Sequence, residues 1–141
     1  MKVSDILKTK GSHVYAVSAN VSVYEAIKEM GEKNIGALLI MDNEKLLGIF
    51  SERDYARKII LKGKNSHETL VKEIMTENVI SVDPDDNIDR CMELMSEKKI
   101  RHLPVIKDNL VTGVISITDV VTAIIAIQKE TISHLHEYIS Q

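Results

Sequence analysis

The chain contains an internal repeat, and this feature constrains its fold more than any other. Residues 14–59 and 79–124 align without a gap at an offset of 65 residues, and eleven of the 46 aligned pairs are identical. In this register the pattern Gly-x-x-Ser-x-x-Asp occurs at 48–54 and again at 113–119. Self-similarity at a fixed period indicates one structural unit used twice. We therefore expect two halves related by a pseudo-twofold axis, with a matched pair of clefts between them.

Both repeats predict the order strand, helix, strand, strand, helix. In the first helix Ser22 starts a capping box with Glu25, and apolar residues then follow helical spacing toward Asn34. Short apolar runs bounded by Asp and Asn predict the paired strands. The strands are expected at 14–17, 37–41 and 46–50 and at 79–82, 103–106 and 111–115, and the second helix of each repeat begins near Ser51, closing at Gly63, or near Ser116. This order predicts an α/β (α+β) fold in which β-α-β-β-α repeats pack through their sheets.

The repeats set the expected domain boundaries. Residues 1–65 form the first repeat, 66–127 the second, and 128–141 a C-terminal helical extension in which apolar residues continue at helical spacing. At 141 residues the chain has the size of one ordinary domain or of two small units that share a core. The apolar tail from Ile125 to Ile139 would strengthen self-association of the chain.

Composition excludes several classes of protein. The formal net charge of -3, with basic and acidic residues mixed, gives no global attraction for nucleic acid. No apolar run reaches the ~18 residues that span a membrane, and the N-terminus lacks a signal-peptide pattern. Cys91 is the single cysteine, so no internal disulfide forms, and its place on a helical apolar stripe predicts a buried thiol. We expect a soluble cytoplasmic protein that binds neither nucleic acid nor membrane.

The sequence gives no positive sign of catalysis. It contains no phosphate-binding Gly-x-x-x-x-Gly-Lys loop, no zinc-protease motif and no cysteine pair with metal spacing. His134 and His136 are two residues apart on an expected helix and therefore point in different directions. We predict no catalytic residue, no metal site and no enzymatic activity.

The two signatures and the segment 100–105, Ile-Arg-His-Leu-Pro-Val, resemble those of cystathionine-beta-synthase (CBS) domains in tandem, the Bateman module. The resemblance covers the chain to about residue 127 and is closest to stand-alone CBS-pair proteins. It implies a regulatory module that binds an adenine nucleotide in the clefts between the repeats. It also implies a flat dimer that pairs through its helices, so we expect a homodimer. The ligand would be AMP, ADP, ATP or NAD(H), with S-adenosylmethionine also open, and binding would change the shape of the module or its affinity for a downstream protein that the sequence does not name.

The resemblance also implies roles for individual residues. Asp54 and Asp119 would hold the ribose hydroxyls, and an ionised carboxylate can indeed accept hydrogen bonds from both hydroxyls of a cis-diol. The phosphate-binding candidates are Ser51, Ser116, Arg53, Thr118, Arg101 and His102. The adenine-pocket candidates are Val17, Ala19, Val21, Ile35, Gly36 and Ala37 in the first repeat and Val82, Pro84, Asp86 and Ile100 in the second. Because Gly36 and Ala37 align with Arg101 and His102, we expect two unequal clefts.

Simpler interpretations remain open beside these. A Ser-x-x-Asp sequence at a helix start is also an ordinary capping box, and capping and ligand binding can coexist. Arg53, Arg57 and Lys58 fit the solvated face of a helix. The strand glycines Gly48 and Gly113 mark a close approach of backbone or of ligand. The alternative function is a dimerisation or docking scaffold that is indifferent to nucleotide.

Overall fold

The computed structural model describes residues 1–140, and the chain forms two compact units. The first-repeat unit consists of residues 13–80 with 108–111, and the second-repeat unit consists of residues 1–12, 81–107 and the chain from residue 112 onward. The start of the chain therefore belongs to the unit that is built from the second repeat. Gln141, the last residue of the expected extension, lies outside the described residues.

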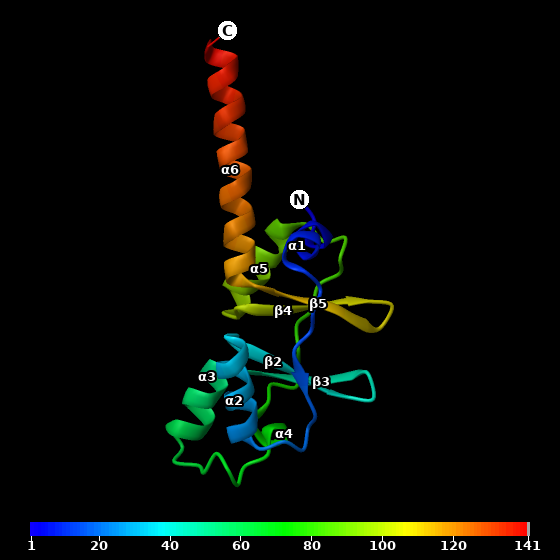
Figure 1. The fold of residues 1–141 in the computed structure, drawn as a ribbon, viewed down its shortest axis with the longest axis vertical. Coiled ribbons are helices and arrows are strands. Elements are labelled where there is room, and N and C mark those ends of the chain that lie inside the picture. The colour runs from blue at the N-terminus through cyan, green and yellow to red at the C-terminus, as the bar shows by residue number, and fades with distance from the viewer. Residues whose placement is uncertain (141) are drawn as a thin grey trace. The chain divides into compact units, whose positions relative to one another are not determined.

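The first-repeat unit contains a three-stranded sheet in the order β1-β2-β3 (Figure 1). β1 (Ala16–Val17) runs parallel to β2 (Ala37–Asp42), which pairs antiparallel with β3 (Lys45–Ser51). Asn43 and Glu44 join β2 to β3 with φ values of 49° and 66°. Two consecutive residues with positive φ form a tight hairpin turn that suits the twist of the strands. The strands predicted at 37–41 and 46–50 and the turn between them are confirmed, whereas the strand predicted at 14–17 is shorter and contains only Ala16 and Val17.

Helix α2 (Val23–Lys33) connects β1 to β2. Oγ of Ser22 accepts a hydrogen bond from the amide of Glu25 over 3.1 Å, and Asn34 ends the helix in the left-handed conformation. These contacts satisfy amide and carbonyl groups that a helix leaves unpaired at its ends. The helix therefore has the bounds that the sequence predicts.

The second helix of the first repeat differs from its prediction. α3 (Glu52–Asp54) leads directly into a π-helical turn, η1 (Tyr55–Ile60), and the C-cap is Leu61 rather than Gly63. Gly63 has a φ of 65° and donates its amide to the carbonyl of Ile60 over 3.2 Å. As expected, Gly63 ends the helical region. It does so in a turn that begins at Leu61, two residues before the glycine.

The core of the first-repeat unit lies between α2, the sheet and the segments that follow β3. α4 (Val71–Ile74) contributes Val71 and Ile74 to this core. The buried members are Ala19, Val23, Ala26, Met30, Leu38, Ile40, Phe50, Ile59, Val71 and Ile74.

In the second-repeat unit the last helix follows a two-stranded sheet. β4 (His102–Lys107) and β5 (Leu110–Ser116) form the sheet, and α5 (Ile88–Lys98) precedes it. α1 (Val3–Lys10), from the start of the chain, and α6 (Ile117–Ser140) complete the unit.

The strand predicted at 79–82 is wrong in extent. Only Val82 pairs, as an isolated parallel bridge to Val105. The next residues leave the strand because the amide of Asp83 donates to the Asp86 carboxylate over 2.8 Å, and Pro84 has no amide to donate. The turn also supplies the N-cap of α5, which is Asn87.

The core of this unit takes side chains from every one of its helices. Val3 and Ile6 of α1 are buried, as are Leu103, Val105 and Ile115 of the sheet. Cys91 on α5 is fully buried, which confirms its predicted place on the apolar stripe. Burial and the charge of Asp86 raise the pKa of Cys91 to about 11, so its thiol stays protonated near neutral pH.

α6 continues well past the repeat, which confirms the predicted C-terminal extension. Its first half buries Val120 and Ala123, whereas every residue from 128 to 140 is exposed. In Figure 1 the orange and red end of α6 projects beyond α1 and α5 of the same unit. Across residues 1–140, none of the helices has the length and apolar character needed to cross a membrane.

Candidate functional site

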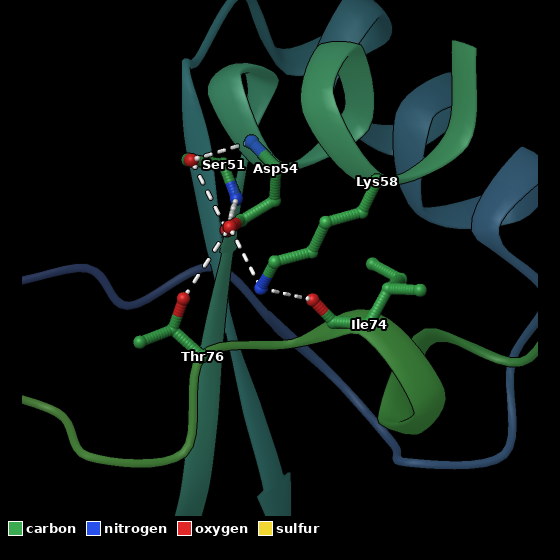
Figure 2. Close-up of polar contacts among 5 residues, drawn as sticks. All are labelled: Ser51, Asp54, Lys58, Ile74 and Thr76. Carbon is green, nitrogen blue, oxygen red and sulfur yellow. Dashed lines mark hydrogen bonds and ion pairs between the residues drawn. The ribbon is translucent and has the colours of Figure 1, made fainter. Parts of the chain in front are cut away.

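The first signature lies where β3 ends and α3 begins, and Ser51 and Asp54 close a complete capping box there. The amide of Ser51 donates to Oδ2 of Asp54 over 3.0 Å, and the Ser51 hydroxyl lies 3.1 Å from the same oxygen. The amide of Asp54 donates back to Oγ of Ser51 over 3.3 Å. Figure 2 shows this closed pattern. The capping interpretation of Ser51 is therefore observed, and the carboxylate is held in a fixed orientation.

Two further side chains reach the other oxygen of this carboxylate. Nζ of Lys58 lies 3.2 Å from Oδ1 of Asp54, and the hydroxyl of Thr76 lies 3.3 Å from it (Figure 2). Lys58 also donates to the carbonyl of Ile74 over 2.9 Å, so its ammonium group is anchored at two points. The expectation that Lys58 merely belongs to a solvated helix face is wrong, because its charge is directed at the signature.

Thr76 reaches the signature because α4 is short. The helix ends at Ile74, and Thr76 then pairs with Ile49 of β3, its amide donating over 2.8 Å and its carbonyl accepting over 3.0 Å. This pairing brings the chain close to Gly48. A Cβ atom at Gly48 would lie 2.8 Å from the carbonyl oxygen of Thr76 and 2.7 Å from Sδ of Met75. The sequence predicted that either backbone or ligand approaches Gly48 closely, and the structure shows the approach of the chain itself.

The second signature repeats the cap at the junction of β5 and α6. The amide of Ser116 donates to Oδ2 of Asp119 over 2.8 Å, and the amide of Asp119 donates to Oγ of Ser116 over 3.2 Å. The amide of Ile117 donates to the carbonyl of Arg101 over 2.8 Å. In the first repeat the amide of Glu52 donates in the same way to Gly36, over 3.1 Å. Each signature is thus fixed to the residue that precedes the first strand of its hairpin.

The lysine that reaches the second signature comes from the other end of the chain. Nζ of Lys10, in the last turn of α1, lies 2.7 Å from Oδ2 of Asp119 and donates to the carbonyl of Val114 over 2.8 Å. Val114 aligns with Ile49, whose carbonyl accepts the amide of Thr76 in the first repeat. α1 is longer than α4 and extends to Lys10. The ammonium group of Lys10 donates to the Val114 carbonyl, as the backbone amide of Thr76 donates to the Ile49 carbonyl in the first repeat.

Lys10 is placed by the packing of α1 against β5. A Cβ atom at Gly113 would lie 2.7 Å from Cδ2 of Leu7, so the glycine lets α1 approach the strand. At the start of the helix the amides of Val3 and Ser4 donate to the carbonyls of Asp86 and Pro84, both over 2.9 Å. These contacts satisfy unpaired amides of the first turn and fix the axis of the helix.

Asp119 is ionised at neutral pH. Burial raises the pKa of its carboxyl group, but the hydrogen bond and positive charge of Lys10 and the hydrogen bonds from Ser116 outweigh burial and lower the pKa below its ordinary value. The carboxylate can therefore act only as an acceptor.

Positive groups gather beside Asp119. Burial lowers the pKa of His102, and the charges of Lys10 and Arg101 lower it further, against the opposing effect of Asp119. An open hollow of about 390 Å³ lies at the start of α6. It is lined by Arg101, Ile117, Thr118, Val121 and Thr122. The structure thus brings together the predicted phosphate-binding residues Arg101 and Thr118, with His102 on the adjoining strand.

The predicted adenine-pocket residues form a loop and a strand start in each unit. In the first-repeat unit Ala19 is buried in the core, Val17, Val21 and Ile35 pack against it, and Gly36 and Ala37 are half-buried. The carbonyls of Ala19 and Val21 accept the amides of Lys72 and Val71 at the start of α4.

In the second-repeat unit Val82 is buried and paired to β4, while Pro84, Asp86 and Ile100 are half-buried. The carbonyls of Pro84 and Asp86 hold the start of α1. Both loops therefore seat a short helix through their backbone, and their contact with adenine remains a prediction.

Sequence reasoning missed three residues at the signatures: Lys10, Lys58 and Thr76. The spacing of Asp54 and Lys58, four residues apart on a helix, was a usable signal. Lys10 and Thr76 reach the carboxylates through tertiary packing and left no local signal.

Two α+β repeats, each with a serine and an aspartate locked at a strand-to-helix junction, define a tandem-repeat module whose polar sites are duplicated. The CBS domain pattern matches residues 3–61 and 71–126. The chain belongs to the CBS-domain family and contains two CBS domains, which confirms the resemblance seen in the sequence.

Similar proteins support this assignment. The Arabidopsis thaliana mitochondrial CBS domain-containing protein CBSX3 is 40% identical over 97% of this chain and 71% of its own length. A Burkholderia ambifaria protein with CBS domains is 48% identical over 89% of this chain and 95% of that chain, with a TM-score of 0.87. The CBS domain protein PAE2072 from Pyrobaculum aerophilum, solved in complex with AMP, shares the fold at 21% identity over 84% of this chain and 89% of that chain, with a TM-score of 0.76.

Proposed function

We propose that this protein is a regulatory module that binds an adenine nucleotide at one or both Ser-x-x-Asp signatures. The observation that carries the proposal is the second signature. There Asp119 is ionised and lies near His102, while Arg101 and Thr118 line an open hollow at the start of α6 whose lining does not include Asp119. A carboxylate can accept from the two ribose hydroxyls, and the basic groups suit a phosphate. The first signature repeats the carboxylate but has Gly36 and Ala37 in place of the basic pair.

The proposed roles follow the chemistry of each group. Asp54 and Asp119 take the ribose, while Arg101, His102 and Thr118 take phosphate at the second signature, and Arg53 serves at the first. Ser51 and Ser116 orient the carboxylates by capping and offer a hydroxyl to phosphate. The loops around Ala19 and Pro84 supply apolar contact to the base. We propose that the protein signals and does not catalyse.

Signalling by such a module requires differential affinity. A ligand shifts the protein between two arrangements only as far as it binds one more tightly than the other. Lys10, Arg101 and His102 carry or can acquire like charge, and a phosphate would relieve their mutual repulsion. The ligand-bound arrangement would then be recognised by a downstream protein.

Self-association is the second part of the proposal. Large apolar side chains on α6 are exposed at intervals of four, seven, three and four residues: Val121, Ile125, Ile132, Leu135 and Ile139. Ile125, Ile132 and Ile139 recur every seven residues and Leu135 lies between the last two, which is the spacing of the a and d positions in a two-stranded coiled coil. We therefore propose a homodimer in which α6 of one protomer packs against α6 of its partner. The single buried cysteine suits a reducing compartment such as the cytoplasm.

The test is a thermal-shift screen against AMP, ADP, ATP, NAD, NADH, S-adenosylmethionine and GMP. AMP is the first probe because a protein of the same fold was solved with it. A ligand at one hundred times its dissociation constant stabilises the native state by about 2.7 kcal/mol. We expect a rise of several degrees with at least one adenine compound and none with GMP. A flat response to the whole panel would favour the alternative, a nucleotide-independent scaffold, which is consistent with two caps that are complete without ligand.

A further inference from the structure

The two signature carboxylates differ in the number of donors that they already hold. A carboxylate offers about four acceptor positions. Asp54 has four donors: the Ser51 amide and hydroxyl on Oδ2, and Lys58 and Thr76 on Oδ1. Asp119 has three: the Ser116 amide and Lys10, both on Oδ2, and the Ser116 hydroxyl. Asp119 has no counterpart of the Thr76 hydroxyl, because the residue that corresponds to Thr76 at the offset of 65 is Gly11.

This difference matters for a cis-diol, which must donate two hydrogen bonds to the carboxylate. At Asp119 one of the about four acceptor positions is open while Lys10 and the cap stay in place. At Asp54 the diol must displace Thr76, Lys58 or the cap for each bond that it makes. Lys58 also donates to the Ile74 carbonyl, so its displacement breaks a second hydrogen bond.

We propose that Lys58 and Thr76 form a latch on Asp54, so that nucleotide fills the second signature first and the latch sets the affinity of the first. The inference rests on the proposed function and adds an order of filling to it. It also assigns a regulatory role to two residues outside the signature itself. Opening the latch would free the Thr76 hydroxyl and, where Lys58 moves, the carbonyl of Ile74 at the end of α4.

The cleanest variant is Thr76→Val. Valine keeps the β-branched shape, and the backbone pairing with Ile49 does not involve the side chain. The side chain of Thr76 is exposed, so the variant should fold. The change removes only the hydroxyl that occupies Oδ1. Thr112→Val is the matched control, because this strand threonine donates to the carbonyl of Val105 and touches neither carboxylate.

The experiment is isothermal titration calorimetry with AMP on the parent chain, Thr76→Val, Thr112→Val, Asp54→Asn and Asp119→Asn, with circular dichroism as the check on folding. We expect a tight phase that Asp119→Asn weakens by at least about 10-fold. We expect a weaker phase that Asp54→Asn removes and Thr76→Val tightens by roughly 2- to 10-fold, with the tight phase unchanged. If the parent shows only one binding phase, Thr76→Val should tighten the second phase enough for calorimetry to measure it. Thr112→Val should match the parent.

The outcomes separate the inference from the proposed function. Binding that is equal at the two signatures, that is tighter at Asp54, or that is unaffected by Thr76→Val would overturn the latch and leave nucleotide sensing intact. No heat and no thermal shift with AMP or ATP on the parent chain would overturn the proposed function and the latch together. Lys58→Met gives an independent measure, since it should also tighten only the weaker phase.

Discussion

Lys10 and Asp119 are 109 positions apart in the sequence, yet Nζ of the lysine lies 2.7 Å from Oδ2 of the aspartate. The contact ties α1 to the second signature and places a positive charge beside the carboxylate proposed to hold ribose. Because Lys10 also bonds to the carbonyl of Val114, one ammonium group supports both the strand and the signature.

Lys10→Met should destabilise the protein by roughly 1 kcal/mol. The lysine side chain is partly exposed, so solvent screens the ion pair, and the loss is that of a modest charge-assisted contact. Urea denaturation measures the change. Lys8→Met, which removes an exposed lysine from the same helix, should leave the midpoint near that of the parent. Equal losses in the two variants would show that the Asp119 contact contributes nothing of its own.

Stability should rise with pH on the acid side of neutrality because of His102. Its pKa in the folded chain is below the ordinary value of about 6.5, so the unfolded chain binds more protons between those two values. The free energy of unfolding therefore increases as pH rises through this window and levels off above it. The groups that face His102 are Lys10, Asp119 and Arg101.

His102→Gln should flatten this pH dependence in thermal melts recorded below pH 7. His136→Gln, an exposed histidine on α6, is the control and should keep the parental slope. A parental slope in His102→Gln would contradict the assignment.

Bound phosphate should raise the pKa of His102, so AMP binding should tighten as pH falls through the same range.

Gly48→Ala should destabilise the first-repeat unit by about 2–3 kcal/mol, because the new Cβ meets a backbone carbonyl and a methionine sulfur. Gly113→Ala should cost less, about 1 kcal/mol, since it meets the movable end of Leu7. Gly31→Ala is the control. It lies in α2 with nothing within 4 Å and should stabilise by about 0.5–1 kcal/mol. Urea denaturation ranks the three, and a harmless Gly48→Ala would refute the packing argument.

Asp54→Ala and Asp119→Ala should each weaken AMP binding at their own signature by about 1–3 kcal/mol, the range of a charged hydrogen bond. Titration with 2′,3′-dideoxy-AMP provides the matched test of the diol. The parent should lose affinity for this compound, and the aspartate variants should not discriminate it from AMP at the altered signature. Discrimination that persists in the variants would place the ribose elsewhere.

Ile132→Lys combined with Leu135→Lys should convert the proposed dimer into a monomer. The two side chains are 66% and 56% exposed, so their replacement removes no core contact. Sedimentation equilibrium gives the mass. Glu137→Lys, a charge change on the same helix outside the apolar seam, should remain dimeric. A monomeric parent chain, or a dimer that survives both lysines, would rule out pairing through α6.

The elements that the sequence predicts well are those with a local physical signature. α2 and both hairpins follow from a cap, from periodic apolar residues and from Asp-Asn turns. The strand predicted at 79–82 is reduced to the bridge at Val82, because the amide of Val79 donates to the carbonyl of Glu77 and not to a neighbouring strand. The π-helical turn of η1 has no comparable signal.

The same distinction holds at the candidate site. The Ser and Asp of each signature are visible as a repeated pattern, but their partners Lys10 and Thr76 are brought there by α1 and by the chain after α4. Contacts of this kind depend on tertiary packing. A single sequence cannot reveal that one carboxylate is more fully occupied than the other.

The most direct test of nucleotide binding at the signatures is a two-dimensional ¹H–¹⁵N NMR titration of the parent chain with AMP. The account predicts that the amides of Ser116 and Asp119 shift first and those of Ser51 and Asp54 at higher AMP concentration. GMP at the same concentrations should leave all four unmoved. Saturable shifts that leave all four amides in place would contradict the account and move the ligand to another part of the molecule.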